Sequence, residues 1–267
     1  MAIDLKQHIS FSEALTFDKC PYNHYLQYVL KKRSEQTIYT MFGTLIGRAI
    51  EDKKKNNNDN ALLELEEKLK SWIVENPFIV RSDDTKEEID TEEWINSARS
   101  IYENIFPFLD KRFPGYELLD FEFPIYEDVP EHTLKFKGYV DFIIKHEGVI
   151  WILDFKTTKR SWNKDTLSDT TKLYQVILYK KFFCEMFSID PTTVATAYLL
   201  LKRAPSKNED VIEIVETTSG KVKLNNSIEW LKEQADGIAA GIKLKKPQTC
   251  SFCNCGSAPK WTPKYKK

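Results

Sequence analysis

The sequence predicts an α/β protein in which strands and amphipathic helices alternate. The main observation is the stretch 138–159, where two short apolar runs, Tyr139–Ile144 and Val149–Phe155, flank a turn that ends in Gly148. This is the pattern of a β-hairpin, because glycine adopts the positive φ of tight turns. In addition, Thr192–Leu201 is apolar and rich in β-branched residues, as expected for a buried strand. Segments with apolar residues at helical spacing stand on both sides of these strands.

The first segment, 8–30, predicts two short helices with an aromatic face. Ser10 and Ser12 are candidate helix caps. Pro21 favours a fresh helix start directly after Cys20, because proline suits the first helical position. We therefore expect a helical hairpin here.

Met41–Asp52 predicts the next helix, in which Gly43 and Gly47 fall on one face. Each glycine inside a helix costs roughly 1 kcal/mol relative to alanine. We therefore expect close packing against a strand, or open space for a ligand, on this face. Glu51 lies on the same face, either as part of a site or as a solvent-facing charge.

The block 52–115 predicts a helical insertion that could cap a cleft. It contains two amphipathic segments, Ala61–Val74 and Glu92–Phe113, separated by an acidic loop, Arg81–Asp90. Residues 1–51 are expected to hold the N-terminal helices, 116–245 the α/β core, and 246–267 a tail rich in cysteine and lysine.

The α/β core is expected to contain three strands, a helix, two further strands and a final helix. The expected strands are Tyr116–Tyr126, Lys135–Ile144, Val149–Thr157, Thr192–Leu201 and Val211–Thr217, and the expected helices are Thr171–Phe187 and Lys221–Ile242. A polar loop, Lys159–Asp169, precedes the first of these helices.

Three charged residues stand out in the hairpin. Asp154 and Lys156 are two positions apart on one strand and therefore point to the same face, and Asp141 can lie across from them. Burying such charges is costly unless they pair or bind a cation. Two carboxylates suit a hard cation such as Mg²⁺. A metal site and a buried structural ion pair are both consistent with this pattern.

Composition excludes few classes of function. The formal net charge is -1 and charged residues make up 30% of the chain, so the overall balance gives no support for nucleic-acid binding. No apolar run reaches the length of a transmembrane helix, and the N-terminus lacks the order of a signal peptide. We expect a cytoplasmic protein without a membrane partner, whose five cysteines are free, metal-bound or cluster-bound rather than disulfide-bonded.

The order of these motifs resembles the PD-(D/E)XK nuclease superfamily in its RecB-like branch, which includes CRISPR-associated and helicase-linked exonucleases. The resemblance covers most of the chain apart from the helical insertion. The matching motifs are Gly138-Tyr-Val-Asp141, Ile152-Leu-Asp154-Phe-Lys156-Thr157, Gln175-Val-Ile-Leu-Tyr179, Ser12…Cys20-Pro21…Tyr25 and Phe42-Gly43-Thr44…Glu51.

The resemblance implies a restriction-endonuclease-like core with a central mixed β-sheet flanked by helices. It implies that Asp141, Asp154 and the backbone carbonyl of Phe155 bind Mg²⁺ or Mn²⁺. It further implies that Lys156 orients the attacking water. The remaining implied catalytic residues, which line and position the same site, are Gln175 and Tyr179.

One departure from the family pattern concerns the metal site. RecB-like nucleases usually carry a histidine one helical turn before the glutamate, and Gly47 stands at that position here. Glu51 is therefore a candidate ligand, directly or through water, and Glu122 is a spare candidate. Weaker metal binding or lost activity are the alternatives.

The cysteines show a second similarity to this branch, in which some members hold an iron–sulfur cluster. Cys20 precedes the core, and Cys250, Cys253 and Cys255 follow it. Four thiolates suffice for a 4Fe–4S cluster or a zinc ion. The interval between Cys253 and Cys255 departs from the family spacing, so unligated cysteines remain an alternative. Cys184 is expected in the core.

The expected activity is metal-dependent hydrolysis of DNA, with an exonuclease on single strands or DNA ends in replication, recombination or repair as the preferred form. A helicase or recombination protein is the expected partner. The alternatives are an impaired nuclease fold that binds DNA or a protein, and an RNA-directed nuclease. The expected DNA contacts are Trp162, Lys159, Arg160, Lys202, Arg203 and the lysine-rich tail with Trp261.

Overall fold

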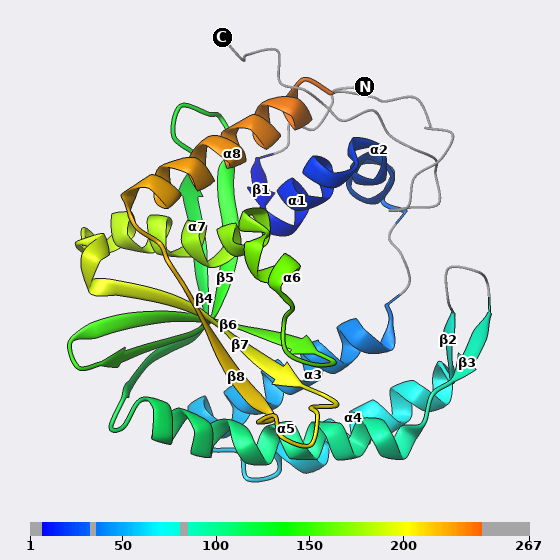
Figure 1. Ribbon diagram of the computed structural model, residues 1–267. Coiled ribbons are helices and arrows are strands. Elements are labelled where there is room, and N and C mark those ends of the chain that lie inside the picture. Colours follow the sequence, from blue (N-terminus) through cyan, green and yellow to red (C-terminus); the bar gives the residue numbers. More distant parts are fainter. Residues whose placement is uncertain (1–6, 33–35, 81–84, 242–267) are drawn as a thin grey trace.

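The computed structural model describes residues 7–32, 36–80 and 85–241. Within these ranges, six strands form one mixed sheet in the order β1-β5-β6-β7-β8, with β4 paired to β5. Helices cover both faces of this sheet (Figure 1). The predicted α/β fold, a central mixed sheet flanked by helices, is confirmed. The predicted tail, 246–267, lies outside the described residues, and no described helix is long and apolar enough to cross a membrane.

The elements follow the predicted order. The strands of the main sheet are β1 (His8–Ser10), β4 (Glu117–Asp128), β5 (Lys135–His146), β6 (Val149–Thr158), β7 (Val194–Lys202) and β8 (Ile212–Thr217). The α-helices are α1 (Phe11–Lys19), α2 (Pro21–His24), α3 (Ile38–Lys55), α4 (Ala61–Glu75), α5 (Thr91–Arg112), α6 (Lys164–Ser168), α7 (Thr170–Phe187) and α8 (Lys221–Ala239). A π-helical turn, η1 (Tyr25–Val29), and a 3₁₀ turn, η2 (Pro191–Thr193), complete the helices.

The N-terminal helices begin where the sequence places their caps. The Ser10 hydroxyl accepts a hydrogen bond from the Glu13 amide at 3.2 Å, which fixes the start of α1. Pro21 begins α2, and the Cys20 sulfur accepts from the Asn23 amide at 3.4 Å. Ser12, the other candidate cap, lies inside α1.

Several short elements were not predicted. β1 pairs with β5 through only three residues. A separate antiparallel pair consists of β2 (Phe78–Val80), just before the expected acidic loop, and β3 (Lys86–Glu88), inside it. α6 lies in the expected polar loop, where the Asn163 side chain caps it by accepting from the Thr166 amide at 2.8 Å. Segments this short carry no measurable hydrophobic period.

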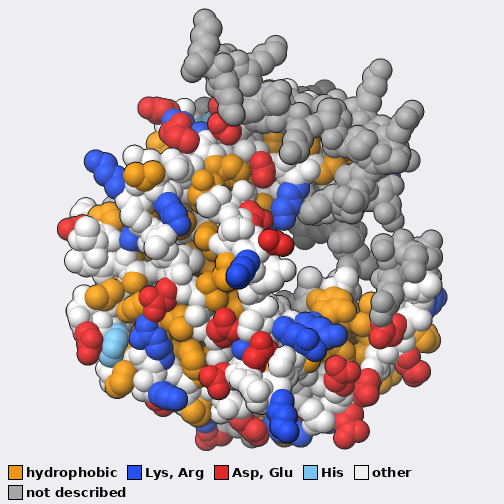
Figure 2. Space-filling view, in the orientation of Figure 1, with side chains coloured by type: hydrophobic (Ala, Val, Ile, Leu, Met, Phe, Trp, Pro, Cys, Tyr) orange, Lys and Arg blue, Asp and Glu red, His pale blue; other side chains and the backbone are white. Residues whose placement is uncertain are grey.

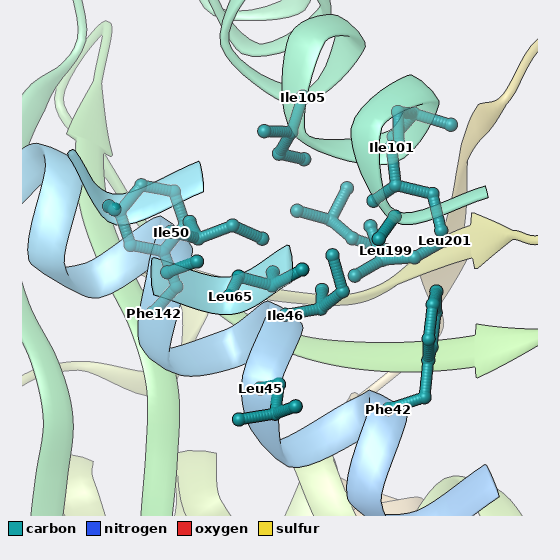
Figure 3. Packing of buried hydrophobic residues seen from close by; sticks show 14 of the residues in the cluster. Phe42, Leu45, Ile46, Ile50, Leu65, Ile101, Ile105, Phe142, Leu199 and Leu201 are labelled. Atoms are coloured by element: carbon teal, nitrogen blue, oxygen red, sulfur yellow. The ribbon is translucent and has the colours of Figure 1, made fainter. Parts of the chain in front are cut away.

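Helices α3 and α5 pack on one face of the sheet, α4 packs on these two helices, and all three share a core with the sheet. Figure 3 shows α3 side chains such as Ile46 facing Ile101 and Ile105 of α5 and Leu199 and Leu201 of β7. Because α4 and α5 lie within 52–115, the expected insertion contributes directly to this core. The boundaries of the predicted domains stay a prediction.

Helices α1, α7 and α8 cover the opposite face (Figure 1). The ribbon of β4 and β5 contributes to both layers. Phe121 and Phe142 pack with α3 and α5, whereas Phe123 and Val140, two residues away on each strand, pack with α7. The side-chain alternation therefore changes sides at Glu122 and Asp141, and Glu122 has a φ of 48°.

Candidate active site

The site begins at a gap in the hydrogen-bonded edge of β5. This edge pairs with β1 through residues 135–137 and with β6 through residues 142–146. Between these ladders, the Asp141 carboxylate takes the place of a backbone partner. Its Oδ2 accepts a hydrogen bond from the Phe155 amide of β6 at 2.7 Å. The gap thus places a carboxylate between two strands.

Asp154, Lys156 and Gln175 meet Asp141 at this gap. The Lys156 ammonium lies 2.6 Å from Asp154 Oδ2 in an ion pair. The Gln175 amide bridges the pair, because its Oε1 accepts from Lys156 Nζ and its Nε2 donates to Asp154 Oδ1, both at 2.9 Å. The same Nε2 lies 2.9 Å from Tyr179 Oη, one turn further along α7. The predicted set is therefore brought together, and its catalytic roles stay a proposal.

Gly138 allows Tyr179 to pack at this position. A β-carbon on Gly138 would lie 2.7 Å from Tyr179 Cε1 and 3.2 Å from Phe136 Cε1, which is too close for any residue with a side chain. The glycine of the predicted Gly138-Tyr-Val-Asp141 motif thus has a steric role in placing the Tyr179 ring beneath the site.

Burial makes the two carboxylates costly to ionise. Desolvation, with a further contribution from the charge of Asp154, raises the pKa of Asp141 well above its usual value. Desolvation also raises the pKa of Asp154, against the opposing effect of the Lys156 ammonium. For Lys156, desolvation lowers the pKa, but the attraction of Asp154 and Asp141 outweighs it and the net shift is upward. The site therefore holds too little positive charge for its two acids.

These residues line one cleft of about 570 Å³, a size typical of small-ligand sites. Its described lining comes from α3, β4, β5, β6 and α7, namely Gly43, Thr44, Gly47, Arg48, Glu51, Phe121, Glu122, Asp141, Asp154, Phe155, Lys156, Thr157 and Gln175. None of these residues belongs to 52–115, so the described part of the insertion packs on the sheet rather than lining the cleft. Acidic and basic side chains are mixed over the surface seen in Figure 2.

The two glycines of α3 serve the two purposes that the sequence suggested. A β-carbon on Gly43 would lie 3.2 Å from Thr157 Oγ1, so this glycine allows α3 to approach β6 closely. A β-carbon on Gly47 would meet nothing within 4 Å, and Gly47 lines the cleft. Gly47 therefore leaves open space at the position where the resemblance to RecB-like nucleases implies a histidine.

We expect Gly47→Ala to raise the free energy of unfolding by up to about 1 kcal/mol, because alanine favours a helix over glycine and has room here. Urea unfolding measures the change. Gly43→Ala, one turn earlier in α3, is the matched control and should gain less, since its methyl group presses on Thr157. A Gly47→Ala protein less stable than the parent would contradict the open space.

Glu51 and Glu122 lie at the mouth of the cleft. Glu51 is half-buried rather than solvent-facing, and the Lys55 ammonium lies 3.5 Å from it and 3.4 Å from Asp120. Glu122 is exposed, yet desolvation and then the charges of Glu51 and Asp154 raise its pKa. Both remain candidate ligands.

The donor set fits a hard divalent cation. Asp154 Oδ2 is buried and accepts no hydrogen bond of good geometry despite its ion pair with Lys156. An added cation would stabilise both carboxylates, whose pKa values are raised without one. Within the described ranges, no group of three or more His, Cys, Asp or Glu side chains gathers closely enough to hold a metal.

The residues expected to contact DNA have different surroundings. Lys159 and Arg160 are exposed at the end of β6. Trp162 is half-buried and packs on Tyr198, with ring centroids 5.1 Å apart. Lys202 is only 3% exposed and pairs with Glu213 at 3.1 Å. A buried, paired ammonium is unavailable to a phosphate, so the expectation for Lys202 is corrected.

Arg203 has a structural contact of its own. Its guanidinium lies over the rings of Trp94, at 4.4 Å, and Tyr39, at 5.0 Å. Burial lowers the pKa of Arg203, and the two rings hold its charge through cation–π attraction. Arg203 therefore joins the end of β7 to α3 and α5.

Sequence reasoning did not identify Arg48, which is exposed and lines the cleft together with Thr44 of the Phe42-Gly43-Thr44 motif. The signal was available, because Thr44, Arg48 and Glu51 lie on the glycine-bearing face of α3 at helical spacing.

Of the four candidate cluster ligands, Cys20 is fully buried at the start of α2. Cys250, Cys253 and Cys255 lie outside the described residues, so the cluster stays a prediction. Cys184 is buried in the core as expected.

Comparison with known proteins places the chain in a family. A search of curated proteins finds no match. Among solved structures, the chain is similar to SSO0001, with 16% identity, 84% of each chain covered and a TM-score of 0.32. It is also similar to protein VC1899 from Vibrio cholerae, with 13% identity over 90% of this chain and 63% of that one, and a TM-score of 0.25. Likenesses this distant carry no information about function. The model of the PD-(D/E)XK nuclease superfamily, in contrast, matches residues 8–258, so this protein belongs to the PD-(D/E)XK nuclease superfamily.

Proposed function

We propose that this protein is a Mg²⁺- or Mn²⁺-dependent deoxyribonuclease of the RecB-like branch. The observation that carries the proposal is the convergence of Asp141, Asp154 and Lys156 in one cleft. Among the described residues, the positive charge near these two carboxylates is too small to balance them, and the one ammonium beside them is that of Lys156. A metal cation and a second positive group near the phosphate both accelerate phosphodiester hydrolysis.

Each protein group has a distinct role in this proposal. Asp141, Asp154 and the Phe155 carbonyl would hold the cation, which when bound would lower the pKa of a water and screen phosphate charge. Lys156 orients the attacking water and stabilises the negative charge that develops on the phosphate. Gln175 positions the side chains of Lys156 and Asp154 through hydrogen bonds to both, and the Tyr179 hydroxyl orients the Gln175 amide.

Cleavage of labelled DNA tests the proposal. Purified protein should degrade DNA with Mg²⁺ or Mn²⁺ and leave it intact in EDTA. Asp154→Asn should abolish cleavage and weaken Mg²⁺ binding in calorimetry by more than tenfold, since a charged ligand is lost. Asp110→Asn, an exposed change on α5, should leave both unchanged. Absence of cleavage with either metal would overturn the enzymatic proposal.

The finer features of the activity rest on the resemblance. We infer an exonuclease acting on single strands or DNA ends in replication, recombination or repair, with a helicase or recombination protein as partner. End-labelled and circular DNA substrates distinguish this from an endonuclease, because a circle without ends resists an exonuclease. The predicted 4Fe–4S cluster would appear as about four irons per chain in anaerobically purified protein.

A second candidate function is binding of DNA without cleavage. The observation that favours it is the open space at Gly47, where related nucleases place a ligand. In that case, DNA binding in EDTA should equal binding in Mg²⁺, and Asp154→Ala should leave it unchanged. A loss of cleavage in the same variant would exclude this candidate.

A further inference from the structure

An exposed row of alternating residues leads away from Asp141 along β5. Lys135, Lys137 and Tyr139 alternate along β5 toward Asp141, where the alternation changes sides, and each is at least partly exposed. The residues between them, Phe136, Gly138 and Val140, are buried. Phe136 stacks on Phe182 of α7 with ring centroids 4.7 Å apart. The exposed row therefore faces away from α7.

The neighbouring strand adds a second aromatic side chain to this surface. Tyr126 of β4 lies directly opposite Lys137, and Pro124 lies opposite Tyr139. Tyr126 and Tyr139 are 44% and 46% exposed, so both rings are open to a ligand. We call Tyr126, Lys135, Lys137 and Tyr139 the lysine–tyrosine strip.

A lysine lies over each ring of the strip. Lys137 Nζ is 5.9 Å from the Tyr139 ring centre, and Lys135 Nζ is 5.6 Å from that of Tyr126. No described carboxylate lies within 4 Å of Lys137. Lys135 pairs with Asp128 at 2.6 Å, but Asp128 is 81% exposed. Such surface pairs contribute little and exchange readily for another anion.

The strip is continuous with the candidate active site. At about 3.3 Å per residue along a strand, Tyr139, Lys137 and Lys135 lie about 7, 13 and 20 Å from Asp141. Glu122, which lines the cleft, is the β4 residue between Phe121 and Phe123, whose partners flank Asp141. A polymer that has its scissile bond at Asp141 and follows β5 would run over the strip.

We propose that the lysine–tyrosine strip binds single-stranded nucleic acid on one side of the scissile phosphate. The proposal rests on the proposed function, because it takes Asp141 as the site of cleavage. Unpaired bases stack on Tyr139 and Tyr126, and phosphates approach Lys137 and Lys135. Aromatic platforms interleaved with cations suit single strands, since every base has a face to stack. Bases in a duplex already stack on each other and present no free face.

Binding of a fluorescein-labelled oligothymidine in EDTA, followed by anisotropy, tests the strip without cleavage. Tyr139→Ala should weaken binding by about tenfold, the scale of one lost stacking contact. Lys137→Ala should lower the slope of log K against log salt by about 0.7, because one phosphate contact is lost. Lys145→Ala, exposed on the same strand beyond the site, and Phe187→Ala, an exposed ring on α7, are the matched controls.

The results separate this proposal from the enzymatic one. Strip variants that bind the oligonucleotide as well as Lys145→Ala and Phe187→Ala overturn the proposal. So does a parent protein that binds duplex DNA more tightly than the single strand and loses both equally on substitution. Bis(p-nitrophenyl) phosphate is too short to reach the strip, so its Mg²⁺-dependent hydrolysis by the parent reports the metal site alone. Failure there overturns the enzymatic proposal, whereas the binding in EDTA still tests the strip.

Discussion

Replacing Lys156 by alanine is expected to lower the rate of DNA cleavage by about 10²- to 10³-fold, the usual loss when one group that stabilises transition-state charge is removed. Lys156 is the cation nearest the two carboxylates, 2.6 Å from Asp154. Its removal also takes a hydrogen bond from Gln175. Single-turnover cleavage of labelled DNA at saturating Mg²⁺ measures the effect.

Two controls separate chemistry from folding in this experiment. Lys111→Ala, an exposed change on α5, should cleave at the parental rate. Calorimetric Mg²⁺ binding by the Lys156→Ala protein should persist, because both carboxylates remain. A Lys156→Ala protein as active as the parent would remove this residue from the site and leave a structural ion pair as its explanation.

Ile101→Ala is expected to lower the free energy of unfolding by about 2–5 kcal/mol, the range for a fully buried aliphatic residue cut to alanine. Ile101 lies in α5, is completely buried, and faces Leu199 and Leu201 of β7 (Figure 3). The change leaves a cavity between the insertion and the sheet. Urea unfolding measures it.

The matched control is Val74→Ala on α4, where the valine is 80% exposed. A surface change of this kind should stay within about 0.5 kcal/mol. If Ile101→Ala were equally mild, the helices of 52–115 would be a separable cap rather than part of the core.

The fold class was predicted correctly, and the charged residues lie together as the sequence suggested, while their roles stay a proposal. Asp154 and Lys156 have the same parity in a strand, and Gln175 and Tyr179 are one helical turn apart, so local geometry alone brings each pair together. Long elements such as α5 and β7 were predicted because their hydrophobic period extends over many residues. The hydrogen bond that the Phe155 amide donates to Asp141 depends on how the two strands pair. In the sequence, only the expected hairpin indicated that these residues could meet.

The features that sequence reasoning missed have physical causes of other kinds. β1 is three residues long and gains its pairing only from β5. Lys202 looked like a surface cation. As the last residue of the apolar strand β7 it is buried with that strand, and Glu213 neutralises its charge. Arg203 follows it directly but is held by aromatic rings from two distant helices. Such contacts between distant segments have no signature in local spacing.

The exchange of faces at Glu122 and Asp141 links the two layers mechanically. Phe121 anchors the β4–β5 ribbon in one layer and Phe123 anchors it in the other. Melting either layer would release the shared ribbon and expose the remaining layer to water. The molecule should therefore unfold as one cooperative unit. Asp141, at the crossover, should stay rigid because both layers of the fold hold its strand in place.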